Sequence, residues 1–165
     1  MKRGKTVSDN ETEAATAEVT TWFFDDYLPT WVSVGNEAID MGPEFILNYW
    51  GVPLYKYHPD GGQWALDADS VVGLLNTTHT RLRTNGYAYT DVVDRAVRAY
   101  HRNGAAIEVI WSRRRADDTE IERLAVHFEV IRTESGWRVA GIQLQPTRAD
   151  VLSQAWAGTD NGGRR

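Results

Sequence analysis

Apolar residues in the first part of the chain recur every three to four positions, the spacing that places them on one face of an α-helix. This pattern predicts a long helix from about residue 10 to residue 34. Pro29 lacks the backbone amide that would bond to the carbonyl of Asp25, so the helix should kink or break between these two residues. The apolar stripe consists of Ala15, Val19, Trp22 and Phe23.

Two further helices are predicted before the middle of the chain. The first is short, over residues 43–50, and has proline at its first turn, where no helical amide is needed. The second starts at a cap supplied by Asp67 or Asp69 and ends near residue 85. Its buried face should consist of Val71, Leu75 and Leu82.

The segment between these two helices, residues 51–57, is predicted to be a short strand. Pro53 cannot donate a hydrogen bond to a neighbouring strand, which favours a position at the edge of a sheet. The sequence His-Pro-Asp-Gly-Gly over residues 58–62 predicts a turn after this strand.

Alternating apolar and polar residues dominate after residue 87 and predict an antiparallel sheet. Helices followed by a run of strands indicate an α+β fold. The expected strands are 89–101, 105–114, 119–132 and 137–145, and a short final helix is expected over 148–156. The turns between the strands should lie at 103–104, 117–118 and 134–136.

Charge pairing indicates the register of the central hairpin. Cross-strand pairs of opposite charge stabilise a sheet by about 0.2–1 kcal/mol each, and a one-residue slip would turn over the faces of one strand. A two-residue turn at 117–118 would place Arg115 opposite Glu120, Arg113 opposite Glu122, Ser112 opposite Arg123 and Glu108 opposite His127.

This register gives the hairpin one apolar face and one mixed face. The apolar face should pack on the helices, whereas the mixed face fits solvent, a subunit interface or the polar rim of a cavity. The apolar face carries Ile107, Val109, Trp111, Leu124, Val126, Phe128 and Val130. The mixed face carries Ala106, Glu108, Ile110, Ser112, Arg123, Ala125, His127 and Glu129.

A chain of 165 residues fits one domain. We expect residues 10–157 to form it, with a flexible N-terminus over 1–9 and a disordered tail over 158–165, because both ends are polar. The net charge of −5 argues against a nucleic-acid partner. The absence of cysteine excludes disulfides and thiolate catalysis. Without an apolar run that suits a signal peptide or a membrane span, a soluble cytoplasmic protein with no membrane partner is expected.

Short motifs accompany this order of elements. They are Tyr49-Trp50-Gly51-Val52-Pro53, Asn85-Gly86-Tyr87, the stretches 107–114 and 126–130, and Gly136-Trp137-Arg138-Val139. Over roughly residues 12–145, the order of elements and these motifs resemble the nuclear-transport-factor-2-like superfamily. Ketosteroid isomerases, polyketide cyclases, scytalone dehydratase and limonene epoxide hydrolase belong to that superfamily.

The resemblance implies a cystatin-like half-barrel. In this fold a cone-shaped, curved, antiparallel or mixed sheet wraps around N-terminal helices and leaves a pocket at its open end, and the protein is commonly a homodimer. It implies no single reaction, because the superfamily contains both enzymes and non-catalytic binding modules. No catalytic set of the isomerases, dehydratases or hydrolases matches this chain residue by residue.

Asp26 is the first candidate for acid–base chemistry. At the regular helical spacing of 100° per residue it falls on the apolar stripe of the first helix. A carboxylate placed there either has a buried partner or faces a cavity, where desolvation would raise its pKa. The other interpretation is that the Pro29 kink turns it to solvent or that it caps a local turn.

His127 and Glu108 form the second candidate, because a carboxylate opposite an imidazole can orient it as a base. A structural pair on the outer face of the sheet or at a dimer interface is the alternative. The apolar ligand would be held by aromatic residues, some of which are instead core. These residues are Trp22, Phe23, Tyr27, Tyr49, Trp50, Tyr55 and Trp111.

Compact metal-ligand spacing is absent, so no metal or other cofactor is expected. The leading hypothesis is a cofactor-independent enzyme that binds a mostly apolar small molecule and carries out cyclisation, isomerisation, dehydration or water addition. Asp26 or His127 would be the acid or base, and Glu108 would orient His127. The alternative is a non-catalytic small-molecule-binding or dimerisation module.

Overall fold

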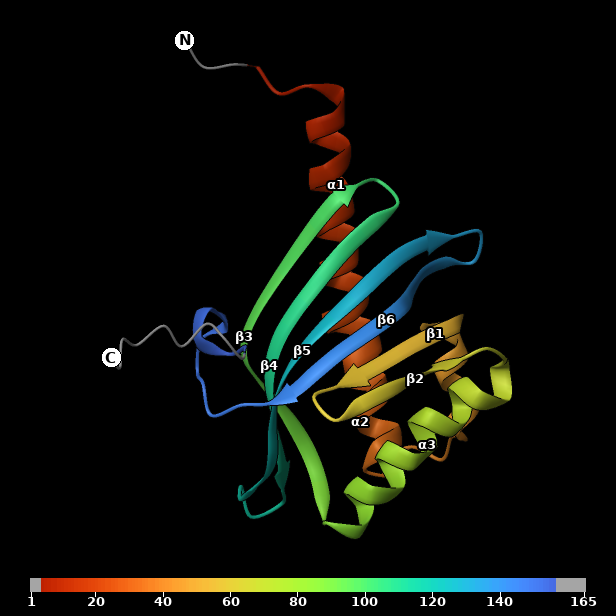
Figure 1. Ribbon diagram of the computed structural model, residues 1–165, viewed down its shortest axis with the longest axis vertical. Helices are drawn as coiled ribbons and strands as arrows, with labels where there is room; N and C mark the ends of the chain where they lie inside the picture. Colours follow the sequence, from red (N-terminus) through yellow and green to blue (C-terminus); the bar gives the residue numbers. More distant parts are fainter. Residues whose placement is uncertain (1–3, 157–165) are drawn as a thin grey trace.

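The computed structural model describes residues 4–156, in which helices precede a curved six-stranded sheet (Figure 1). The helical elements are α1 (Val7–Thr21), a π-helical turn (Trp22–Tyr27), α2 (Leu28–Gly35), a 3-10 helix (Pro43–Asn48), α3 (Ala68–Thr84) and a last 3-10 turn (Leu152–Gln154). The strands are β1 (Trp50–His58), β2 (Gly61–Ala65), β3 (Tyr87–His101), β4 (Gly104–Arg115), β5 (Glu120–Thr133) and β6 (Gly136–Pro146).

The first helix begins at Val7, earlier than the predicted residue 10. Thr6 caps it, because its side chain accepts from the amide of Asp9 while the Asp9 carboxylate accepts from the Thr6 amide. Residues 7–9, predicted to be flexible, are therefore helical. Residues 158–165, predicted to be a disordered tail, lie outside the described residues.

The helix is not broken between Asp25 and Pro29, where a kink or break was predicted, but its winding changes there. Residues 22–27 widen into a π-helical turn, in which the amide of Leu28 bonds to the carbonyl of Phe23. Pro29 follows in the first turn of α2, where a proline needs no helical hydrogen-bond partner. The wider turn joins α1 to α2 and changes which side chains face the sheet.

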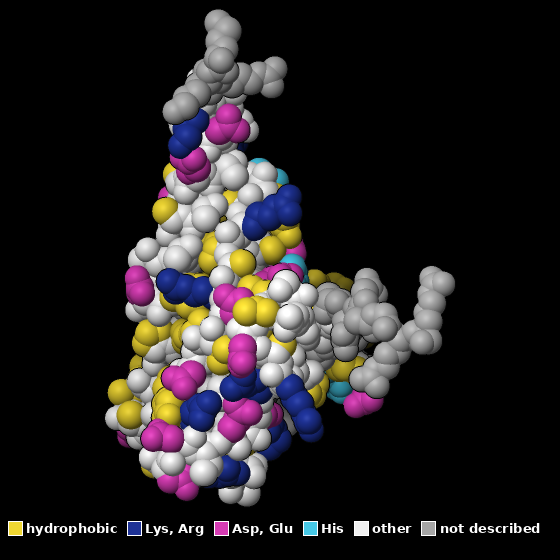
Figure 2. Space-filling view, turned by 90° about the vertical axis from the view of Figure 1, so that its left-hand side faces the viewer, with side chains coloured by type: hydrophobic (Ala, Val, Ile, Leu, Met, Phe, Trp, Pro, Cys, Tyr) yellow, Lys and Arg dark blue, Asp and Glu magenta, His cyan; other side chains and the backbone are white. Residues whose placement is uncertain are grey.

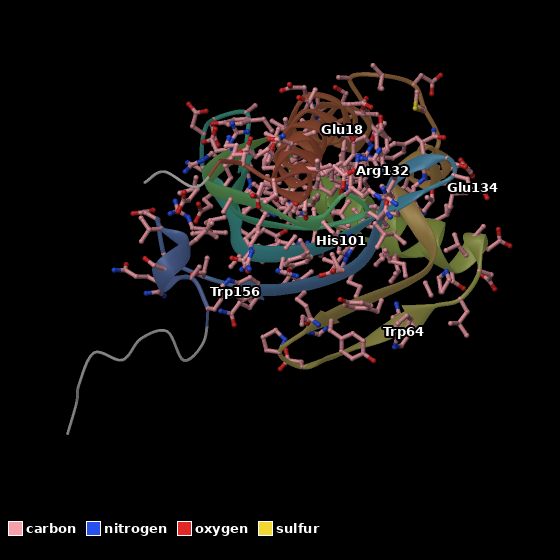
Figure 3. All side chains as sticks on the ribbon, turned by 90° about the horizontal axis from the view of Figure 1, so that it is seen from above. Glu18, Trp64, His101, Arg132, Glu134 and Trp156 are labelled. Atoms are coloured by element: carbon pink, nitrogen blue, oxygen red, sulfur yellow. The ribbon has the colours of Figure 1, made fainter. Side chains whose placement is uncertain are left out.

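The six strands are ordered β2-β1-β6-β5-β4-β3. Strand β1 runs parallel to β6, and all other neighbours are antiparallel. The sheet curls around the continuous helix α1–α2, and α3 packs beside β1 and β2 (Figure 1). Seen from above, α1 covers one face of the sheet, whereas Trp156 lies on the other (Figure 3).

The prediction that β1 is an edge strand is wrong, because the unpredicted strand β2 pairs with its outer side. Pro53 is accommodated by an irregularity in the β1–β6 pairing, between the pairs of Trp50 and Tyr55. No ladder amide is needed there, which is the other position that a sheet allows for proline.

The central hairpin has the predicted register over most of its length. Arg113 faces Glu122, Ser112 faces Arg123 and Glu108 faces His127. The pair of Arg115 with Glu120 does not form, because a bulge places Arg114 opposite Glu120. The turn is also longer than two residues, since the Arg115 amide bonds to the Thr119 carbonyl and Asp118 has a φ of 68°.

The apolar face of the hairpin packs on the helices and forms the main core, as predicted. Phe23 contacts both Trp111 and Phe128, with ring centroids 6.5 Å and 4.9 Å away. On the opposite face, Ile110 and Ala125 form a small cluster with the C-terminal segment, including Ala155. That segment contains only a three-residue 3-10 turn, so the helix predicted over residues 148–156 is largely absent.

Candidate functional site

A cavity of about 540 Å³ lies between the inner face of the sheet and the helices. Its lining includes the β1–β2 turn at residues 58–60 and the end of β6 at Leu144 and Pro146. Its volume is within the range of about 300–1,000 Å³ that is usual for ligand sites. Its mostly apolar wall includes Trp31, Trp50, Trp111, Val126, Phe128 and Ile142.

One side of the cavity is polar and centres on Arg113. This residue is 6% exposed, and its guanidinium stacks on Trp31 and Trp111 at 4.7 Å and 5.4 Å from their ring centroids. Its Nη1 donates to Glu122 Oε1 at 2.6 Å, and the same oxygen accepts from Arg81 Nη2 at 3.0 Å. The Glu122 carboxylate therefore accepts hydrogen bonds from two guanidinium groups.

Glu122 stays ionised in this arrangement. Burial acts to raise the pKa of its carboxyl group, but the hydrogen bond from Arg81 and the charge of Arg113 outweigh burial and lower the pKa. Glu122 is therefore a fixed negative charge at neutral pH, and it does not hold a proton for donation to a ligand.

Lys56 is the third cation of the cavity and has no salt bridge among residues 4–156. Its Nζ donates to the Thr78 hydroxyl at 3.2 Å. Burial, assisted by the charges of Arg113 and Arg81, lowers the pKa of Lys56 to about 8. This amine can therefore gain or lose a proton close to neutral pH.

Tyr27 contributes a phenol to the same cavity from the π-helical turn. Its hydroxyl accepts a hydrogen bond from Trp50 Nε1 at 3.1 Å. Burial raises the pKa of Tyr27, so the phenol stays protonated and its O–H can donate to a ligand.

Three of the seven predicted aromatic residues line this cavity: Tyr27, Trp50 and Trp111. The other four lie elsewhere. Phe23 is fully buried in the core, and Trp22 lines a separate, open depression between α1 and the β5–β6 hairpin. Tyr49 is buried beside Phe45, and Tyr55 packs against Trp64 on β2.

Asp26 is exposed and does not line the cavity, although it accepts a hydrogen bond from the Tyr49 hydroxyl at 2.8 Å. It borders the open depression that includes Trp22 and the Glu18–Arg132 ion pair, whose members lie close together in Figure 3. The prediction placed Asp26 on the apolar stripe by assuming regular α-helical spacing. The π-helical turn breaks that spacing, so Tyr27 takes the inward position.

His127 and Glu108 face each other as predicted, but on the sheet face opposite the cavity. The Nδ1 atom of His127 lies 3.2 Å from Glu108 Oε1, and its Nε2 lies 3.4 Å from Glu129 Oε2. The structure thus does not bring Asp26 together with this pair. Their catalytic roles stay predictions, and so does the homodimer in which this outer face would be an interface.

Sequence reasoning missed the polar residues of the cavity: Lys56, Arg81, Arg113 and Glu122. A signal for two of them was present, because the register paired Arg113 with Glu122. These residues continue the apolar face of the hairpin by one more alternation, which places them on the cavity side. Lys56 and Arg81 could not be found from the hairpin register, because their positions depend on how β1 and α3 pack.

Outside the cavity, acidic side chains outnumber basic ones. Figure 2 shows acidic and basic side chains interspersed over one face of the molecule.

Within residues 4–156, no group of three or more His, Cys, Asp or Glu side chains could hold a metal ion. None of the helices in that range has the length and apolar composition that crossing a bilayer requires.

A family model described as NTF2-like protein (DUF6841) matches residues 17–147, which is most of the chain. The chain belongs to this NTF2-like family. No curated protein matches it.

Solved structures of NTF2-like proteins share the fold. A nuclear transport factor 2-like protein from Salmonella enterica is 14% identical, with a TM-score of 0.60 over 87% of this chain and 99% of that one. An NTF2-like protein with a cystatin-like fold from Novosphingobium aromaticivorans is 18% identical, with a TM-score of 0.56 over 83% and 85%. A ketosteroid isomerase-like protein from Parabacteroides distasonis is 9% identical, with a TM-score of 0.50 over 72% and 84%. At these low sequence identities, the similarity to the three structures shows a shared fold alone.

Proposed function

We propose that this NTF2-like protein binds a small molecule with a mostly apolar body in the cavity between the sheet and the helices. The observation that carries the proposal is the cavity itself, with its volume of about 540 Å³ and its aromatic and aliphatic wall. Sites of this size and composition bury most of the surface of a drug-sized ligand. The relative described as ketosteroid isomerase-like is consistent with such a ligand but supports only the fold.

Methyl-resolved NMR tests this proposal, because methyl groups mark both faces of the sheet. We expect bicyclic aromatic compounds, such as naphthalene-1-acetamide, to shift the methyl signals of Val126, Ile142 and Leu144 on the cavity wall. The methyl groups of Ile110 and Ile131, which are absent from that wall, are internal controls. Shifts confined to these two residues, or no shifts with a panel of aromatic compounds at millimolar concentration, would contradict the proposal.

Cofactor-independent acid–base turnover of the bound molecule is a second candidate function. The observation that favours it is Lys56, whose pKa of about 8 suits proton transfer near neutral pH. A neutral Lys56 amine would take a proton from the carbon next to a ligand carbonyl. The electron pair would move to the carbonyl oxygen, and the cationic side of the cavity would stabilise the resulting oxyanion.

Hydrogen–deuterium exchange into a bound ketone tests this second function. Wild-type protein in D₂O should incorporate deuterium next to the carbonyl of a ketone that binds in the cavity, and Lys56→Met should lose this exchange while still binding the ketone. Equal exchange rates in the two proteins would contradict a role for Lys56 in proton transfer.

A further inference from the structure

The polar side of the cavity has more hydrogen-bond donors than acceptors. Arg113 donates to Glu122 through Nη1, but its Nε has no hydrogen-bond partner among residues 4–156. The indole nitrogen of Trp111, on the same wall, is also buried without a partner among them. Both nitrogens are covered by protein atoms, so the donors that a ligand in the cavity can meet are those of the lining cations Lys56, Arg81 and Arg113.

The charged side chains that line the cavity also favour a ligand with a negatively charged acceptor. Three cationic side chains and two carboxylates line the cavity. With His58 neutral, the net charge of the lining is +1. Glu122 pairs with both Arg113 and Arg81, so Lys56 is the lining cation that has no salt bridge among residues 4–156. The cations of the cavity are Lys56, Arg81 and Arg113, and the other ionisable lining groups are Glu122, Asp60 and His58.

We infer that the ligand carries one carboxylate, which binds at the cationic side between Arg113 and Lys56 while its apolar body fills the aromatic part of the cavity. A guanidinium matches the planar geometry of a carboxylate, and the stacking of Arg113 on two tryptophans holds it in place. A monoanion would neutralise the lining, whereas a dianionic phosphate would leave an excess of negative charge. This inference rests on the proposed function of the same cavity.

The protonation of Lys56 supports this assignment and makes the affinity for a carboxylate depend on pH. Its pKa of about 8 reflects burial and two neighbouring cations, so a bound carboxylate would favour the protonated form and shift the pKa upward. Affinity for the acid should therefore fall as pH rises above about 8. The charged groups around Lys56 are Arg81 on α3, Arg113 on β4, Glu122 on β5 and, at the adjoining turn, His58 and Asp60.

A matched ligand pair tests the inference. Naphthalene-1-acetic acid and naphthalene-1-acetamide have the same apolar body, and their dissociation constants at pH 7 can be measured by titration calorimetry together with the methyl shifts. We expect the acid to bind at least tenfold more tightly, and 1-naphthyl phosphate to bind no more tightly than the acid. Equal affinities of acid and amide would overturn the inference while leaving the proposed function in place. Tighter binding of the phosphate would overturn the carboxylate assignment.

Variants of Lys56 complete the test. Lys56→Met should lower the affinity for the acid about tenfold, leave that for the amide unchanged and remove the fall in acid affinity above pH 8. Lys56→Arg should restore the preference for the acid. Lys5→Met, which removes an exposed cation on α1's N-terminal side, should change neither affinity. Equal losses for acid and amide in Lys56→Met would overturn the inference, and binding of neither ligand to wild type would contradict the proposed function as well.

Discussion

Replacing Glu122 with glutamine tests how the cationic side of the cavity is held together. Glu122 is the carboxylate that bonds to both Arg113 and Arg81, and the side chains of Arg113 and Glu122 are 7% and 21% exposed. Breaking a buried ion pair by neutralising one partner costs about 3–5 kcal/mol, because the other charge stays buried. We expect about 3 kcal/mol for Glu122→Gln, since Glu122 is partly exposed and an amide oxygen still accepts from Arg113.

The pH dependence of this loss follows from the pKa of Glu122, which lies below its ordinary value of 4.5. A carboxyl group with a lowered pKa stabilises the folded state above the pKa of the unfolded chain, and this contribution is lost as pH falls through the folded pKa. The difference in free energy of unfolding between wild type and Glu122→Gln should therefore be full at pH 7 and should shrink below pH 4.5.

Urea denaturation of both proteins at pH 7 and in acid measures this difference. Glu13→Gln is the matched control, because it neutralises a carboxylate whose ion pair with Lys5 is 59–62% exposed. That change should cost only about 0–1 kcal/mol. If Glu122→Gln costs no more than Glu13→Gln at pH 7, or if its cost persists unchanged in acid, the account of the buried pair is wrong.

Two further substitutions test the two faces of the sheet. Phe128→Ala removes a ring that is 2% exposed and packs on Phe23, so it should lower the free energy of unfolding by about 3–5 kcal/mol, seen as a lower denaturation midpoint at an unchanged slope. His127→Ala removes a partly exposed imidazole from the outer face and should cost about 0–1 kcal/mol. It should leave ligand affinity in calorimetry unchanged, and a large loss of affinity would place His127 in the function of the cavity.

Local chemistry made much of the fold predictable. The cap at Asp67 and the stripe of Val71, Leu75 and Leu82 define α3. Cross-strand charge pairs such as Arg113 with Glu122 fixed the register of the central hairpin. These signals depend on residues that are neighbours along a helix or across one turn, so a single sequence contains them.

Features that depend on packing between distant segments were not predictable in the same way. Strand β2 reads Gly-Gly-Gln-Trp-Ala and is mostly exposed, so it lacks the alternation that identifies a strand; pairing with β1 holds it. The pair of Glu108 and His127 was predicted correctly, but the sequence could not tell which face of the sheet lines the cavity. Lys56 and Arg81 line the same cavity as Arg113 only because α3 packs beside β1.

The π-helical turn at residues 22–27 has a consequence for how the chain tolerates length changes. Such a turn accommodates one residue more than a regular helix would hold in the same space. Deleting a single residue within it would restore regular winding but would rotate everything on one side of it relative to the other. Tyr27 and Trp31 would then turn together relative to Ala15 and Val19 of α1, so the core face of α1 and the cavity wall could no longer both face the sheet. Shortening the exposed start of α1, before Ala15, would leave that wall in register.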